Sequence, residues 1–596
     1  MIHSGTRSLL TDALTPPPGF LFDNGVATTY SLDLVTLLGL PLHLAWLGHA
    51  QENSGEFDLV AVMEALRRTA GQLTIFCQRG RMQAPRTASP LYGLLEGMVH
   101  EVTASHGGAF HPKVWLLRFT SEIDVPRLRL LVLSRNLTDD RSWDLSLSLE
   151  GTIGGKKLQA NKPLCALLER TMKMSHKPLS RARRSNAESL VADVMRCEWD
   201  LPPGFNELRF HALGVGDKAK AWLPLPADGC WDTLGVISPF VRTEALRRLA
   251  ESCKEAPFLI TRAEELDALP VDAAEKFAAV WVMDERAEAS DTEEAVVGRE
   301  RGLHAKAYVG KRAWQTHLFV GSANASDAAL VAGKNVEFMV ELIGKASRVG
   351  KPGDWLSEDG IGPLLTEYVR SEPGDTATDR KQKQQLEDMR ERLCSAQLSL
   401  RCKAVDGGWS VGLAGLDQFD LRDVKGWTWP VTVRSEAAVP IRCDEALLHL
   451  GVFSAQDITA FTGFRLALGK HELWFAQALH LLGAPADREG EMLRAALRNN
   501  DGFVRYLLLL LGDWEPGSGI GGGGKRGSGG ARADGLPLFE MMARAYARDP
   551  GRLAHVSQVV ARLRKESTAP DDEILSADFL KIWRCFEEAL NEQGSE

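Results

Sequence analysis

The sequence GLHAKAYV at residues 302–309 decides how the rest of the chain is interpreted. His304 and Lys306 are two residues apart, so in a β-strand both side chains point to the same face. Asn324 follows in the sequence GSAN, at the end of a second predicted strand. A histidine, a lysine and an asparagine on one face suit a phosphate. The lysine supplies charge, the asparagine donates a hydrogen bond, and the histidine attacks or donates a proton.

The same pattern occurs earlier, in the sequence FHPKVWLL at residues 110–117. Its histidine and lysine are His111 and Lys113, and its asparagine is Asn136. In each copy a serine lies two residues before the asparagine and an acid follows it. These residues are Ser134 and Asp144 in the first copy, and Ser322 and Glu337 in the second. A single H-x-K is weak evidence, because many buried histidines are core residues, but two copies in the same order indicate a function.

These motifs resemble the signature of the phospholipase D superfamily, an H-x-K with a downstream G-S-x-N, duplicated around one active site. The resemblance covers about residues 1–345. Most members have an aspartate five positions after the lysine, whereas this chain has Arg118 and Lys311 there. In that respect it is similar to the tyrosyl-DNA phosphodiesterase branch, which uses H-x-K and a later asparagine. The resemblance therefore implies phosphodiesterase activity more than lipid cleavage.

Helix–strand alternation and the resemblance together predict an α/β fold with two α/β/α sandwich repeats related by a pseudo-twofold axis. Residues 1–205 form the first repeat with a basic connector, and 206–372 the second. A small β-rich region at 373–470 and a helical module at 471–596 follow. The helical module is interrupted by a Gly-rich linker at 517–530.

Within these parts, several elements are expected from periodicity. A helix at 31–38 would be capped by Ser31 or Thr29. Residues 374–383 are polar without apolar periodicity, which predicts a domain boundary there. Helices are expected at 472–482 and 489–497.

The resemblance also implies the roles of the site residues. One histidine attacks phosphorus to give a phosphohistidine, and the other protonates the leaving oxygen and then activates water. In the family that the motifs resemble, the histidine of the N-terminal copy is the nucleophile, which implies this role for His111. Asp144 and Glu337 are expected to hold the ring nitrogens, with an ordinary strand-end acid as the alternative for each. Arg135 and Arg242 are candidate substrate contacts, although Arg242 also fits a plain surface arginine. No metal or other cofactor is expected, because lysines and asparagines stabilise the five-coordinate phosphorus.

The composition of the chain limits which classes of protein are possible. The formal charge of −9 argues against a surface that is basic all over, and allows a local basic groove. Nine cysteines without a C-x-x-C pair indicate neither a zinc ribbon nor a disulfide framework, which favours a reducing, cytoplasmic setting. The start of the chain lacks the pattern of a signal peptide. The most apolar stretch, 34–50, falls short of the roughly 20 residues that a membrane helix needs, so no membrane association is expected.

The sequence thus predicts a metal-independent nuclease that acts on DNA rather than RNA. It is expected to serve in a bacterial anti-phage defence system, with a helicase or another defence protein bound through the C-terminal region. One alternative is a phospholipid hydrolase or transferase. The other is a catalytically silent nucleic-acid-binding scaffold. The histidine and lysine of both copies are intact, which favours an enzyme, and the sequence leaves the oligomeric state open.

Overall fold

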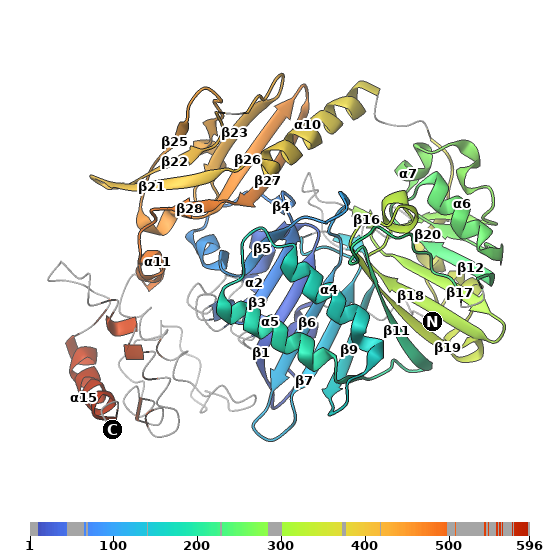
Figure 1. Cartoon of the computed structure of the whole chain (residues 1–596), viewed down its shortest axis with the longest axis horizontal. Helices are drawn as coiled ribbons and strands as arrows, with labels where there is room; N and C mark the ends of the chain where they lie inside the picture. The colour runs from blue at the N-terminus through green and yellow to red at the C-terminus, as the bar shows by residue number, and fades with distance from the viewer. Residues whose placement is uncertain are drawn as a thin grey trace, which may run out of the picture.

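The computed structural model describes residues 10–44, 69–139, 141–226, 229–283, 301–371, 377–417, 419–497 and 577–593, with a few isolated positions (Figure 1). Three parts are named below. The first lobe is residues 10–199, the second lobe is residues 205–371, and the C-terminal unit is residues 377–482.

A seven-stranded mixed sheet forms the centre of the first lobe, in the order β10-β9-β7-β6-β1-β3-β5. Its strands are β1 Leu21–Thr29, β3 Leu73–Gln78, β5 Val99–Val102, β6 Val114–Thr120, β7 Arg127–Leu133, β9 Ser146–Ile153 and β10 Cys197–Trp199. Strands β1, β3 and β5 are parallel, and β6, β7 and β9 continue the sheet as antiparallel neighbours.

The second lobe contains a sheet of the order β11-β19-β18-β17-β12-β14-β15-β20, with β13 beside β12. Its strands are β11 Phe205–Leu213, β12 Trp231–Ile237, β13 Cys253–Glu255, β14 Leu259–Ile260, β15 Val280–Met283, β17 Ala307–Arg312, β18 Gln315–Gly321, β19 Glu337–Lys345 and β20 Leu365–Glu367. The run β19-β18-β17-β12-β14-β15 has the order and strand directions of β9-β7-β6-β1-β3-β5 in the first lobe. The predicted mixed α/β fold is confirmed.

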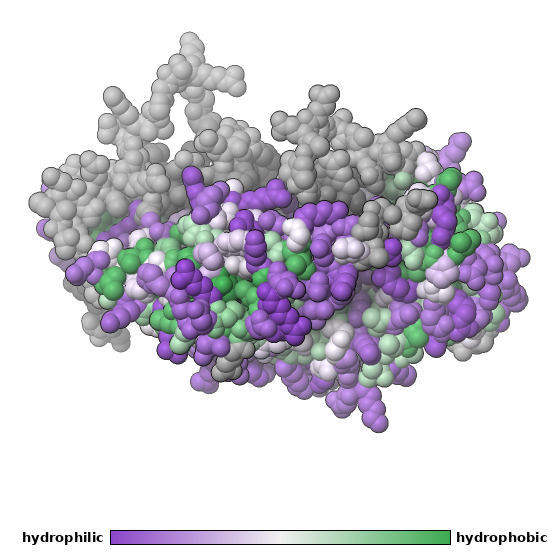
Figure 2. All heavy atoms as spheres, turned by 90° about the horizontal axis from the view of Figure 1, so that it is seen from above, coloured by the Kyte–Doolittle hydropathy of each residue, from purple (hydrophilic) through white to green (hydrophobic). Residues whose placement is uncertain are grey.

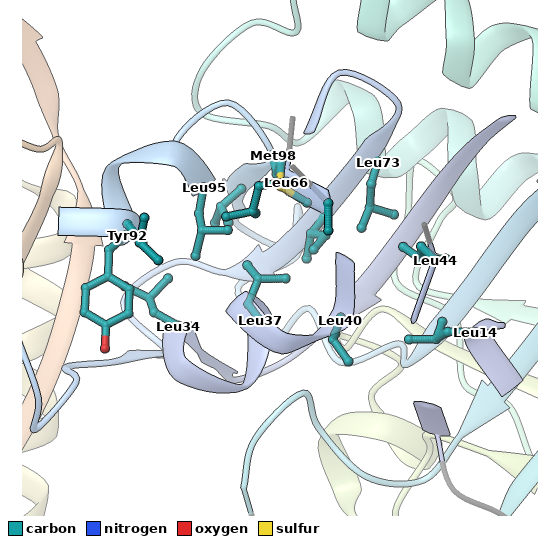
Figure 3. Packing of buried hydrophobic residues seen from close by; sticks show 14 of the residues in the cluster. Leu14, Leu34, Leu37, Leu40, Leu44, Leu66, Leu73, Tyr92, Leu95 and Met98 are labelled. Carbon is teal, nitrogen blue, oxygen red and sulfur yellow. The ribbon is translucent and has the colours of Figure 1, made fainter. Parts of the chain in front are cut away.

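Helices cover both faces of the first sheet. They are α1 Leu10–Leu14, α2 Leu34–Leu44, α4 Lys162–Lys173 and α5 Arg181–Val194, and the second lobe adds α6 Thr243–Glu251, α7 Ala263–Asp267 and α9 Ala346–Val349. Strand β6 alternates between the faces: Leu116 packs with α4 and α5, and Leu117 packs with α2. Figure 3 shows the α2 side, where leucines of the helix meet Leu73 of β3 and residues 92–98.

One hydrophobic core runs through both lobes. It joins Leu116 and Leu130 of the first sheet to Val320 and Val340 of the second, with Leu303 among them. The two sheets are therefore packed as one body, and the segment before His304 lies inside their shared core.

The cap of α2 differs from the expectation. Asp33, not Ser31 or Thr29, accepts hydrogen bonds from the amides of Val35 and Thr36, at 3.2 and 3.0 Å. The helix starts later than expected because residues 32–33 form the short strand β2 (Leu32–Asp33), and the carboxylate then stands at the capping position.

The C-terminal unit is a β-structure with one long helix, α10 Ala377–Ser395. A four-stranded sheet has the order β25-β22-β21-β28, and a six-stranded sheet has the order β2-β4-β27-β26-β23-β24. Their bounds are β4 Met82–Gln83, β21 Ser399–Val405, β22 Gly408–Ala414, β23 Lys425–Pro430, β24 Val439–Pro440, β25 Leu447–Phe453, β26 Phe461–Leu468, β27 His471–Ala478 and β28 His480–Leu482. The second sheet thus includes two short strands of the first lobe.

Two expectations for this region are wrong. The helix predicted at 472–482 is β27 and β28, because Leu473 and Phe475 face inward while Glu472 and Trp474 face outward, which is a two-residue period. The β-rich region therefore continues past residue 470, to Leu482. Residues 377–383 of the polar segment belong to α10, whose buried apolar residues Leu386, Met389 and Leu393 begin only after them.

Further along, α11 Arg488–Leu497 matches the helix expected at 489–497, and α15 Ala577–Gln593 lies within the predicted helical module. The Gly-rich linker 517–530 lies outside the described residues, so the helical module remains a prediction as a whole.

Two carboxylates of the first lobe hold the C-terminal unit. Glu96 accepts hydrogen bonds from Thr459 and from the amide of Ala460, at 2.9 and 2.8 Å, and pairs with Arg488. Glu101 is buried and accepts from the amide of Ala478 at 3.1 Å. These contacts dock the unit firmly on the first lobe.

On the surface face in Figure 2, hydrophilic residues are interspersed with smaller hydrophobic groups. In the part of the chain that is described, no helix is long and apolar enough to cross a membrane.

Candidate active site

Each H-x-K lies in an extended segment directly before a strand of its sheet, β6 for His111 and β17 for His304. Each segment runs alongside the other lobe. The amide of His111 donates to the carbonyl of Val336 at 2.9 Å, and that of His304 donates to the carbonyl of Trp143 at 2.8 Å. Val336 precedes Glu337 and Trp143 precedes Asp144, so the backbone of each histidine is bonded to the residue just before the acid of the other lobe.

The two imidazoles are held in the same way. His111 Nδ1 lies 3.0 Å from the carbonyl oxygen of Ser322, and His304 Nδ1 lies 3.0 Å from that of Ser134. A ring nitrogen beside a carbonyl carries the proton, which leaves the lone pair on Nε2. In the described residues neither Nε2 has a hydrogen-bond partner. Both rings therefore keep Nε2 for chemistry.

Two fully buried lysines accompany the histidines. Lys113 Nζ donates to the carbonyl of His111 at 2.9 Å, and Lys306 Nζ donates to the carbonyls of His304 and Ser134, at 2.8 and 3.2 Å. Their residues are 1% and 0% exposed. Burial lowers the pKa of Lys113 well below its ordinary value, and Lys306 lowers it further while Glu337 opposes both.

Glu337 is the acid that holds a histidine. Its Oε2 lies 2.9 Å from His111 Nδ1 and accepts from Ser322 Oγ at 2.5 Å, while Oε1 accepts from Asn335 at 3.1 Å. Burial alone would raise the pKa of Glu337, but His111 and Lys113 outweigh it and the pKa is lowered. Glu337 thus lies against His111 as a carboxylate.

Asp144 does not take the equivalent place. Among the described residues its carboxylate pairs with Arg135 at 3.4 Å, whereas His304 Nδ1 contacts Ser134 and Lys306. The expectation that Asp144 holds a ring nitrogen is therefore not met, because aspartate is one methylene shorter than glutamate. Burial raises the pKa of Asp144, against the opposing charges of Arg135 and Lys306.

The candidate substrate arginines already have partners. Arg135 also donates to the carbonyl of Thr138 at 2.8 Å. Arg242 stands before α6, where its side chain pairs with Glu265 at 2.6 Å and remains 53% exposed.

The motif serines and asparagines have matching backbone partners in the two lobes. Ser134 Oγ accepts from the amide of Leu145 at 2.7 Å, and Ser322 Oγ accepts from that of Phe338 at 3.0 Å. These bonds fix the loops that carry the serine carbonyls.

The side-chain oxygens of Asn136 and Asn324 are buried, and within the described residues they have no hydrogen-bond partner. At each asparagine the following amide is fixed by a hydroxyl: Leu137 by Thr29 at 3.0 Å, and Ala325 by Ser238 at 2.9 Å.

Burial and the lysines keep both histidines neutral. Burial lowers the pKa of His111 to about 4, with Glu337 opposing and the two lysines adding to the effect. Burial lowers the pKa of His304 far below its ordinary value, and Lys306, Lys113 and Arg262 add to it. The charge of each lysine lowers the pKa of the histidine of the other lobe, so the four groups belong to one electrostatic centre.

Three residues of this centre lie outside the motifs. Tyr30 meets the His111 ring edge-on, with 5.2 Å between ring centroids. Gln78 Oε1 accepts from the amide of Phe110 at 2.7 Å, and Arg262 Nε donates to the carbonyl of Leu303 at 2.8 Å. Tyr30 follows β1, Gln78 is the last residue of β3, and Arg262 follows β14, so their positions depend on the sheets and not on a sequence motif. In the described residues, no group of three or more histidine, cysteine or acidic side chains is placed to hold a metal ion.

Comparison with known proteins gives distant structural matches. Yeast tyrosyl-DNA phosphodiesterase is 14% identical over 57% of this chain and 86% of its own, with a TM-score of 0.34. Phosphatidylserine synthase of Haemophilus influenzae Rd KW20 is 10% identical over 64% of this chain and 90% of its own, with a TM-score of 0.33. Neither a protein-family model nor a curated protein matches the sequence. Structural matches at this level of similarity assign no activity to the chain.

Proposed function

We propose that the chain is a phosphodiesterase that cleaves nucleic acid through a phosphohistidine intermediate. We also infer that the two lobes are copies of one unit arranged around a single reaction centre. One observation carries the proposal: each imidazole is held at Nδ1 by the serine carbonyl of the other lobe, with a buried lysine beside it. This leaves two Nε2 atoms and two cations for one phosphodiester.

In the first step, His111 Nε2 bonds to phosphorus and the bond from phosphorus to the leaving oxygen breaks. His304, which is neutral in the free protein, takes up a proton from solvent at Nε2 when the phosphodiester binds, and that proton moves to the leaving oxygen. In the second step water gives a proton to His304 Nε2, its oxygen bonds to phosphorus, and the phosphorus–nitrogen bond breaks. The net change is hydrolysis of a diester to a monoester and an alcohol.

The division of roles follows from the neighbours of each Nδ1. His111 Nδ1 lies against the carboxylate of Glu337, which stabilises the positive charge that the ring gains when it bonds to phosphorus. His304 Nδ1 has the ammonium of Lys306 at 3.3 Å, which makes its imidazolium a stronger acid. His111 is thus the nucleophile and His304 the acid.

The charge of the five-coordinate phosphorus is met by Lys113 and Lys306, with the amides of Asn136 and Asn324 as further donors. These groups are already fixed by the fold, so the reaction needs little reorganisation. Because the site carries its own cations, cleavage is expected without a divalent metal.

Nucleic acid is the proposed substrate, with DNA preferred to RNA, and a role with a helicase in anti-phage defence stays a prediction. The test is incubation in EDTA with single-stranded and duplex DNA, RNA, and phosphatidylcholine vesicles. Cleavage of nucleic acid is expected, together with a covalent nucleotidyl adduct on His111 that is stable in alkali and labile in acid. Cleavage that disappears in EDTA and returns with magnesium would contradict the mechanism, and turnover of the vesicles alone would make the chain a phospholipid hydrolase.

A further inference from the structure

We propose that Arg262 forms a second phosphate-binding position on the His304 side of the site, for the phosphate next to the scissile one, which rests on the proposed phosphodiester chemistry. The substrate class that follows is a polynucleotide. A lipid with one phosphodiester has no phosphate to place there.

Arg262 is fixed beside the reaction centre at two points. Its Nε donates to the carbonyl of Leu303, the residue before His304, at 2.8 Å. Its guanidinium carbon lies 5.0 Å from the centre of the Phe240 ring, within the range of a cation–π contact. The side chain also acts electrostatically on His304, whose pKa it helps to lower. The guanidinium therefore lies close to where the leaving group departs.

One donor of this guanidinium is unused. Arg262 Nη2 is buried and has no hydrogen-bond partner within the described residues. Other arginines nearby are neutralised by carboxylates, such as Arg242 by Glu265, but no ion pair involves Arg262 in that part of the chain. An arginine keeps its charge at any physiological pH, and a buried charged donor without an acceptor costs free energy. A substrate phosphate supplies both the acceptor and the counter-charge.

The corresponding position of the first lobe is neutral. Strand register gives the correspondence: Ile75 pairs with Ala27, which pairs with the residue four after His111. Leu259 pairs with Val236, which pairs with the residue four after His304. Gln78 lies three residues after Ile75, and Arg262 lies three residues after Leu259, so the two residues occupy corresponding positions.

Gln78 and Arg262 each contact the backbone of the residue before the histidine of their own lobe. Of these two corresponding residues, Arg262 is a cation and Gln78 is neutral. The two corresponding positions therefore differ in charge. A chain of phosphates then binds in one direction, with its extra phosphate on the leaving-group side.

The first test changes the protein. R262Q reproduces the side chain of the other lobe, can still donate to Leu303, and removes the charge. Its kcat/KM for a single-stranded DNA oligonucleotide is expected to fall about 10- to 100-fold, mainly through KM. Its rate on bis(p-nitrophenyl) phosphate, which has one phosphate, should stay within about twofold of wild type. R247Q, which removes a partly exposed arginine of α6 that is paired with Glu244 and Glu251, is the matched control and should leave both rates unchanged. Equal losses on both substrates, or no loss on the oligonucleotide, would overturn the proposal.

The second test changes the substrate and leaves the protein intact. A neutral methylphosphonate replaces the phosphate next to the scissile one, on the leaving-group side or on the opposite side. Wild type should lose rate only with the leaving-group-side substitution, and R262Q should not respond to it. Equal sensitivity on both sides would overturn the second position. If wild type cleaves neither substrate, the proposed function fails. Binding of the oligonucleotides to H111A, with and without R262Q, then still decides the role of Arg262.

Discussion

His111 and His304 occupy equivalent positions but have opposite electrostatic neighbours. Both give Nδ1 to a serine carbonyl, yet one ring lies against Glu337 and the other against Lys306. A carboxylate favours a ring that becomes positive, and an ammonium favours one that gives up a proton. The chemical asymmetry of the site therefore comes from two residues, within a backbone arrangement that is the same in the two lobes.

Replacing the two histidines tests whether they serve one reaction. H111A and H304A are each expected to lose about 10²-fold or more of turnover on a DNA oligonucleotide, because each removes a nucleophile or an acid. The double variant should be little worse than the worse single one, since a centre without one partner has little left to lose. H449A, which removes an exposed histidine of the C-terminal unit, is the control. Single variants that each keep about half the activity would mean two independent sites.

Anion binding should be coupled to uptake of a proton. In the free protein both histidines are neutral near pH 7, because burial lowers the pKa of His111 to about 4 and that of His304 still further. An anion between Lys113 and Lys306 offsets their charge and raises the pKa of His304, so uptake of about one proton is expected. Calorimetry of inorganic phosphate binding, in two buffers of different ionisation enthalpy, measures this uptake. H304A should bind without it. Proton-free binding by wild type would show that His304 does not become the acid.

The motif residues could be predicted from sequence because each set lies on adjacent segments, where spacing alone brings the side chains together. Gln78 and Arg262 could not, since their place depends on strand register in a sheet. The contrast between Glu337 and Asp144 depends on side-chain length against a fixed backbone, which a pattern of acids does not reveal.

At the scale of elements, apolar periodicity correctly predicted the helix at 489–497, which is α11. It failed for β27, where the two-residue alternation covers only part of the strand, and for α10, whose first two turns are polar. The start of α2 was misplaced because two residues before it pair as β2 with β4, which is contributed by a segment about fifty residues later. Long-range pairing of this kind leaves no local signal.

The cap of α2 gives an element-level prediction. D33A removes the acceptor for two helix amides and for the hydroxyl of Thr36, so the free energy of unfolding should fall by about 1 kcal/mol. S31A changes the residue that sequence alone favoured as the cap and should have little effect. D33N should keep most of the stability, because asparagine caps about as well. Urea unfolding followed by circular dichroism measures all three, and equal losses in D33A and S31A would contradict the assignment.

At the scale of the whole molecule, the C-terminal unit reaches the surroundings of His111. Glu387 of α10 pairs with Arg81 at 3.0 Å, and Arg81 lies over the ring of Tyr30, 5.1 Å from its centre. Tyr30 in turn meets His111 edge-on. Strand β27 also pairs with β4 through Ala476 and Met82, so the unit shares a sheet with the first lobe. Polar composition after residue 372 predicted a boundary in the chain, but composition does not report how closely two parts pack.

The last prediction concerns a fragment that ends at residue 371. It should be less soluble and unfold at lower temperature than the full chain. It would leave Glu101 without its Ala478 partner and would uncover the core residues that contact Phe461 and Ala476. E387Q in the full chain is the matched control: it weakens the ion pairs of Glu387 with Arg81 and Arg390 and keeps the C-terminal unit in place, so its unfolding temperature should fall less than that of the fragment. Thermal unfolding and sedimentation measure both proteins. A fragment as stable and as active as the full chain would show that the two lobes fold without the C-terminal unit, as the composition boundary by itself suggests.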